Sequence, residues 1–176
     1  YGRIADYIYR TIKKKKGNYM VFFPSYLFLK KVHEAFELRA DETITCICQE
    51  SGMREEEREA FLEAFQGEKE EALVAFCVMG GIFGEGIDLK REQLIGAIIV
   101  GTGLPQIRYP GMNKVLQAAG RVIRTADDVG IIELLDERFL QNDYQRLFPR
   151  EWEQRSVCQL SNLEEKLTVF WEEKHL

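Results

Sequence analysis

Short apolar runs alternate with longer polar-faced segments along this chain, and this alternation restricts the fold more than any other feature. Each run is nearly free of polar side chains, which is typical of strands buried on both faces of a parallel sheet. The pattern predicts an α/β fold with a mainly parallel sheet covered by helices on both faces. The runs are YMVFFP (19–24), TITCICQ (43–49), ALVAFCVM (72–79), LIGAIIVG (94–101) and GIIELLD (130–136).

The segments between the runs have the composition and spacing of helices. Residues 25–39 place apolar side chains at helical spacing behind Ser25, a good N-cap residue. Residues 54–67 form a polar-faced segment that we expect Gly67 to close, and a third helix is predicted from about Met112 to Arg124. Ligands of such folds bind beyond the carboxyl ends of the strands. The segments to inspect there are 24–26, 49–50, 80–88, 101–106 and 136–139.

Composition and length limit the classes of protein to which the chain can belong. Its 176 residues suffice for one ordinary domain, and 45% hydrophobic with 30% charged residues is a soluble globular composition. A net charge of −5 argues against a freestanding basic nucleic-acid binder, although it leaves room for a local basic patch. No apolar run is long enough for a membrane span, and the start at Tyr1 shows no leader pattern, so we expect a cytoplasmic protein of which this is an excised piece.

The cysteines do not follow the spacing of a metal site. Cys46, Cys48, Cys77 and Cys158 form no C-x-x-C pair, and three of them sit in strand-like apolar runs. Cys46 and Cys48 would point to the same face of a strand. We interpret them as reduced core cysteines, expect no metal site and give His33 and His175 no role.

The stretch QAAGRVIR (117–124) carries polar groups where a core-facing helix would carry aliphatics. On a helix, Gln117, Arg121 and Arg124 fall within about one third of the circumference. Guanidinium groups are the side chains best suited to phosphate oxygens, and two of them near each other could stabilise charge in phosphoryl transfer. The alternative is a surface helix whose arginines pair with acids such as Asp127 or Glu133.

A glycine-rich stretch, GGIFGEGIDL (80–89), follows the third apolar run. Its glycines free the backbone to present N–H groups to a ligand, and Glu85 and Asp88 flank Gly86. By itself the stretch is weak evidence for a functional site. Its combination with GTGLP (101–105) and QAAGRVIR (117–124) is specific evidence for one.

The order FFPSY, FGEGIDL, GTGLPQ, QAAGRVIR and GIIELLDERF resembles the second motor domain of superfamily 2 DNA helicases of the DinG/XPD (Rad3-like) family, the bacterial DinG-like members most. The resemblance covers about residues 1–150 and implies a RecA-like fold, with 151–176 as a helical tail that packs on the same domain or docks a partner. It implies an ATP-dependent DNA helicase, with a role in DNA repair, that moves 5′ to 3′ on single-stranded DNA.

The resemblance also implies roles for single residues. Gln117, Arg121 and Arg124 match helicase motif VI, whose arginines reach the γ-phosphate of ATP. Residues of motif V are implied to bind the nucleotide, and residues that follow two strands are implied to contact the nucleic acid. The motif V residues are Gly84, Glu85, Gly86 and Asp88, and the nucleic-acid contacts are Ser25, Tyr26, Thr102 and Gly103. The alternative for Ser25 and Tyr26 is a plain helix cap and a packing residue.

Two departures from the family pattern matter. The Walker A loop GxxxxGK[ST] and the DEAH box are absent; both belong to the first motor domain, which is therefore the implied partner and the main holder of ATP and Mg²⁺. This chain alone is expected to be inactive and to hold no Fe–S cluster. The link at 105–114 is also shorter than is usual in the family. Two alternatives stay open, namely an RNA helicase or remodeller and a non-catalytic nucleic-acid-binding module.

Overall fold

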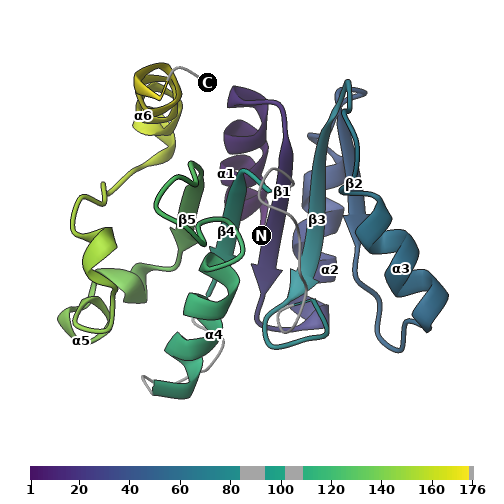
Figure 1. Cartoon of the computed structure of the whole chain (residues 1–176), viewed down its shortest axis with the longest axis horizontal. Coiled ribbons are helices and arrows are strands. Elements are labelled where there is room, and N and C mark those ends of the chain that lie inside the picture. Colours follow the sequence, from purple (N-terminus) through teal and green to yellow (C-terminus); the bar gives the residue numbers. More distant parts are fainter. Residues whose placement is uncertain (84–93, 102–108, 175–176) are drawn as a thin grey trace.

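The computed structural model describes residues 1–83, 94–101 and 109–174. Its strands form one parallel five-stranded sheet in the order β2-β3-β1-β4-β5 (Figure 1). The predicted α/β class and parallel sheet are therefore confirmed. The strands are β1 (Asn18–Phe23), β2 (Ile44–Cys48), β3 (Ala72–Val78), β4 (Gly96–Val100) and β5 (Ile131–Leu135).

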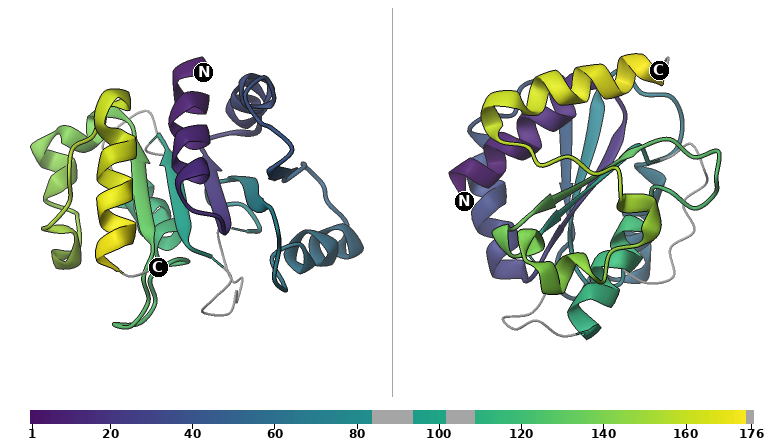
Figure 2. Two further views of the ribbon diagram at one scale, coloured as in Figure 1. Left: turned by 90° about the horizontal axis from the view of Figure 1, so that it is seen from above. Right: turned by 90° about the vertical axis from the view of Figure 1, so that its left-hand side faces the viewer.

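Helices cover both faces of the sheet, and the alternation of side chains along each strand explains why. In β1, Met20 and Phe22 point into one apolar cluster, whereas Tyr19, Val21 and Phe23 point into the other. The first cluster is closed by α3 (Glu55–Glu63) and α4 (Tyr109–Ala119), and the second by α1 (Gly2–Lys14) and α2 (Tyr26–Glu37) (Figure 2).

The segment after β5 returns across the domain. It contains the short helices η1 (Glu137–Leu140), α5 (Asn142–Gln145) and η2 (Arg150–Trp152) and ends in α6 (Leu160–Glu173). Leu163, Leu167 and Trp171 of α6 are buried against side chains that include Tyr7 of α1, and Figure 2 shows the two helices side by side. No helix in the described ranges is both long and apolar enough to cross a bilayer.

The end of α3 differs from the sequence prediction. Helix α3 ends at Glu63, not at Gly67, because Phe61 and Phe65 both enter the core and the Phe65 carbonyl accepts a hydrogen bond from Asn18 Nδ2 at 3.0 Å. Gly67 lies in the following turn with φ +79°. At α6 the N-cap is Gln159, and Asn162 Oδ1 accepts the Gln159 backbone N–H at 2.8 Å.

Candidate functional site

The candidate residues divide between the two edges of the sheet. The strands run downward in Figure 1, so their carboxyl ends lie at its lower edge. Ser25 and Tyr26 follow β1 directly and belong to this carboxyl edge. Helix α4 lies near the same edge, where Lys114 approaches Gly80 after β3, and the connection that follows the helix reaches the amino edge, where Val122 approaches Gly130 just before β5. Arg121 therefore lies at the amino edge, across the sheet from Tyr26.

The prediction that Gln117, Arg121 and Arg124 share one helix is wrong. Helix α4 ends at Ala119, so only Gln117 is helical, and it is exposed. Glycine at 120 is a poor helix former, and after it Val122 turns into the core and is 3% exposed. That burial directs the chain toward β5 and places both arginines in the connection that follows the helix.

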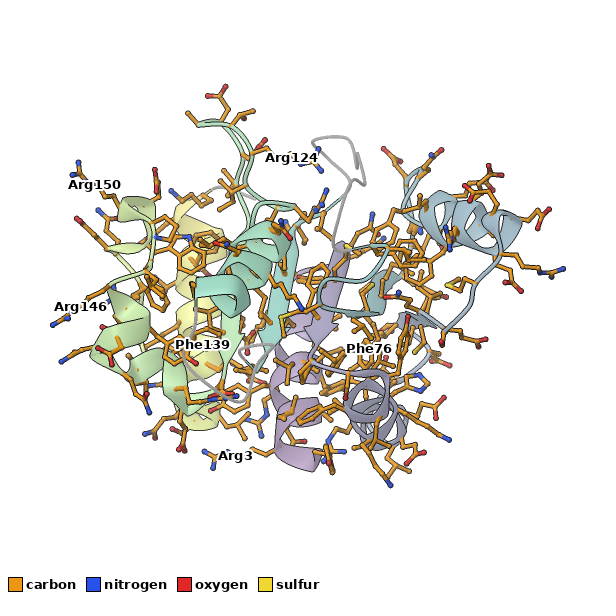
Figure 3. The ribbon with its side chains drawn as sticks, turned by 90° about the horizontal axis from the view of Figure 1, so that it is seen from below. Arg3, Phe76, Arg124, Phe139, Arg146 and Arg150 are labelled. Carbon is orange, nitrogen blue, oxygen red and sulfur yellow. The ribbon has the colours of Figure 1, made fainter. Side chains whose placement is uncertain are left out.

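A side-chain cap organises the connection around the second arginine. Asp128 Oδ2 accepts the backbone N–H of Arg124 at 2.8 Å and that of Thr125 at 2.7 Å. Arg121 is half-buried and Arg124 is exposed. Figure 3 shows Arg124 on the segment that projects from the domain between α4 and β5, whereas Phe76 lies in the packed interior next to α2. The amino edge thus carries two arginines, the half-buried Arg121 and the exposed Arg124.

At the carboxyl edge, Ser25 and Tyr26 are both exposed but differ in their local bonds. Ser25 is the N-cap of α2, and its Oγ accepts the Phe28 N–H at 3.2 Å. The Tyr26 hydroxyl accepts a hydrogen bond from Gln49 Nε2 at 3.0 Å. Gln49 itself is 3% exposed, and its Oε1 accepts the Val78 N–H at 2.9 Å. The Tyr26 hydroxyl is therefore fixed to the ends of β2 and β3, while the residue as a whole remains 38% exposed.

Two further groups at this edge had no role in the sequence interpretation. The Lys114 ammonium lies 3.3 Å from the position that a Cβ on Gly80 would take, so this cation sits beside the start of the glycine-rich stretch. Asp136 follows β5 and its carboxylate binds the Arg138 side chain at 2.7 Å. Burial works to raise the pKa of Asp136, but the hydrogen bonds from Arg138 outweigh it and hold the pKa below its usual value. In the sequence, only the helical spacing of residues in the α4 segment could have indicated a role for Lys114.

Six of the predicted site residues lie outside the described residues. They are the four motif V residues Gly84, Glu85, Gly86 and Asp88 and the two strand-end residues Thr102 and Gly103.

Strand β5 carries a buried carboxyl group on the face of the sheet that α1 covers. Glu133 Oε2 accepts the Thr11 hydroxyl at 2.7 Å, while Oε1 is buried without a hydrogen-bond partner. Burial raises the pKa of Glu133 to about 7, although the Thr11 hydrogen bond opposes this shift. The group is enclosed between α1 and the sheet and faces neither edge, so we do not include it in the site.

Solved helicase structures share this fold. The chain superposes on the apo structure of XPD with a TM-score of 0.60 and 23% identity, over 82% of this chain and 33% of that one. The C-terminal domain of the DEAD-box protein Dbp5 gives a TM-score of 0.55 at 10% identity, over 94% of this chain and 91% of that domain. The E. coli DExH-box NTPase HrpB gives 0.54 at 14% identity, over 89% of this chain and 18% of that one. These matches confirm the RecA-like fold.

Sequence comparison gives the family. The ATP-dependent DNA helicase CHL1 of Eremothecium gossypii is 24% identical over 199 aligned residues, which cover 92% of this chain and 25% of that protein. The chain thus spans about a quarter of this relative's length. The family model described as "Helicase C-terminal domain" matches residues 8–111 and 107–155, two stretches that overlap at residues 107–111. The chain belongs to the helicase C-terminal domain family.

Proposed function

We propose that this chain is the second motor domain of a longer ATP-dependent DNA helicase of the XPD/Rad3-like type, which translocates 5′ to 3′ on single-stranded DNA. The observation that carries the proposal is the separation of its candidate residues, with arginines at one edge of the sheet and hydroxyl groups at the other. Two separated edges suit a domain that links a nucleotide to a nucleic-acid strand. The chain matches only a quarter of the helicase relative's length, which supports the presence of the first motor domain elsewhere in the protein.

The amino edge is the proposed nucleotide-facing side. Arg121 and Arg124 would bind the γ-phosphate of an ATP held mainly by the other motor domain, because this sequence has neither a Walker A loop nor a DEAH box. Those missing elements supply the phosphate-binding lysine and the Mg²⁺ ligands. An arginine is permanently charged and offers several N–H donors, so it stabilises negative charge that develops on the transferred phosphoryl group. Asp128 would help to hold Arg124 in place through the backbone.

The carboxyl edge is the proposed nucleic-acid side. The Tyr26 hydroxyl accepts from Gln49 and therefore keeps its own O–H to donate to a phosphate oxygen. Ser25 Oγ accepts the Phe28 N–H and likewise keeps its proton. The first turn of α2 begins between them and adds the positive end of a helix dipole. The exposed Tyr26 ring could stack on a base, which is a contact tolerant of sequence.

The proposal is tested by strand separation with the full-length protein. DNA duplexes carrying a single-stranded 5′ or 3′ overhang, and matched RNA duplexes, are incubated with ATP and Mg²⁺. We expect ATP-dependent separation of the DNA duplex with the 5′ overhang. Preference for the 3′ overhang would refute the direction, separation of RNA alone would favour an RNA helicase, and nucleic-acid binding without ATP hydrolysis would leave a non-catalytic binding module.

Tyr26 provides a test at the level of one contact. In the full-length protein, Tyr26→Ala should weaken single-stranded DNA binding by about 1–3 kcal/mol if the ring stacks on a base. Tyr26→Phe keeps the ring and removes the hydroxyl, so it measures the phosphate contact alone. Fluorescence titration with labelled single-stranded DNA measures both, and the melting temperature of each variant reports packing. A lower melting temperature with an unshifted DNA titration would show that Tyr26 is only a packing residue.

A further inference from the structure

Three side chains of metal-binding type converge where α2 packs over β2, the strand at one end of the strand order. His33 comes from the middle of α2, and Cys46 and Cys48 come from β2. One ligand atom of each lies within 4.8 Å of those of the other two. In the described part of the chain this is the one such group of three. We propose that His33, Cys46 and Cys48 form a binding site for one zinc-type divalent metal ion.

The backbone explains the convergence. Residues two apart in a strand point to the same face, so both thiols point toward the cluster that α2 covers. The His33 ring stands edge-on to Phe76 of β3, with ring centroids 5.6 Å apart and planes at 80°. Its Nε2 lies 3.7 Å from Glu37 Oε1, one helical turn later. Phe76 and Glu37 thus flank the imidazole beside the two sulfur atoms.

The donor set has the chemistry that zinc prefers. Thiolate and imidazole are its usual protein ligands, in tetrahedral arrangement. Three protein ligands leave the fourth position to water, and the Glu37 carboxylate adds a negative charge 3.7 Å from the imidazole Nε2. All three ligands are half-buried, which leaves a path for an ion. Cys77 is different, since it is fully buried in the opposite cluster and serves only packing.

The ion would connect α2 directly to β2. Strand β2 is at the end of the strand order and pairs with β3 alone. Helix α2 begins at the carboxyl edge with Tyr26. A metal ion bound to both would fix the helix onto this strand, and it would stabilise the folded domain by mass action because the unfolded chain lacks the arranged site.

Cobalt(II) is the probe for the test, because it replaces zinc and its visible spectrum reports tetrahedral thiolate ligation. The 176-residue chain is reduced, freed of metal with a chelator and titrated with Co²⁺ and then Zn²⁺. We expect one equivalent of Co²⁺ to give tetrahedral d–d bands and a sulfur-to-cobalt charge-transfer band, which one equivalent of Zn²⁺ abolishes. Zn²⁺ should also raise the melting temperature by several degrees.

Variants locate the site. Cys46→Ser, Cys48→Ser and His33→Gln should each weaken Co²⁺ binding at least tenfold and lose the rise in melting temperature, while their metal-free far-ultraviolet circular dichroism stays that of the parent. Cys158→Ser is the matched control and should behave as the parent chain. The absence of tetrahedral bands in the parent, or bands that survive in both cysteine variants, or their loss in Cys158→Ser, would overturn the proposal.

Discussion

Glu133 shows how one residue in this domain links stability to pH. Its carboxyl group is buried, with Thr11 as its hydrogen-bond donor, and its pKa is raised from 4.5 to about 7. The folded state therefore retains a proton over a pH range in which the unfolded chain has lost it. The free energy of unfolding must then fall as the pH rises through that window.

The variant Glu133→Gln removes this titration. For the parent, the shift from 4.5 to about 7 corresponds to a fall of about 3 kcal/mol in the free energy of unfolding between those pH values. Urea unfolding across that range should show a smaller fall in Glu133→Gln, and the variant should be the more stable protein at pH 7.5. Glu165→Gln, at an exposed position of α6, is the control and should keep the parent's slope. Equal slopes in the parent and Glu133→Gln would contradict the assignment.

Single residues were predictable from the sequence where local chemistry determines their place. Ser25 was predicted as an N-cap and is one, because a serine before an apolar helical pattern is a local signal. Residues that meet through the tertiary fold were not predictable. His33 had no cysteine near it in sequence, and it reaches Cys46 and Cys48 only because α2 packs over β2. Lys114 reaches Gly80 for the same kind of reason.

At the scale of elements, the strands were predicted better than the helix ends. Four of the five strands lie within the predicted apolar runs and β1 starts one residue before its run, since burial on both faces leaves a strong continuous signal. The end of α4 was missed by five residues. The sequence from Gly120 to Arg124 keeps a helical spacing of polar groups, but the burial of Val122 next to Gly130 outweighs it. Tertiary packing here overrides a local pattern.

The contact between Val122 and Gly130 gives a prediction about that connection. A Cβ at position 130 would lie 2.3 Å from Val122 Cγ1 and 2.8 Å from the Ile95 carbonyl oxygen, so the backbone must shift. Gly130→Ala should therefore cost about 1–3 kcal/mol and lower the melting temperature by several degrees.

Gly120→Ala is the matched control, because its nearest contact would be the Leu116 carbonyl oxygen at 3.3 Å. Thermal unfolding followed by circular dichroism compares the two variants. If Gly130→Ala melts with the parent, the close packing of the α4–β5 connection is not as described.

For the whole molecule, the proposed function gives this domain only part of a nucleotide site. We predict that the 176-residue chain alone has no ATPase activity, because the phosphate-binding lysine and the Mg²⁺ ligands are not in its sequence. Phosphate release is measured with and without single-stranded DNA, with the full-length protein as the positive control. Turnover by the isolated chain that survives Arg121→Ala would contradict a two-domain nucleotide site.

If the two edges of the sheet bind separate ligands, Arg121→Ala and Arg124→Ala in the full-length protein should affect only one of them. We predict that each substitution lowers kcat for ATP hydrolysis by roughly 10³-fold, the scale on which arginine fingers act. We expect the affinity for single-stranded DNA without nucleotide to be unchanged, whereas Tyr26→Ala should weaken that affinity and leave kcat at saturating DNA nearly unchanged. Near-normal hydrolysis by both arginine variants together with lost DNA binding would contradict the assignment of the edges.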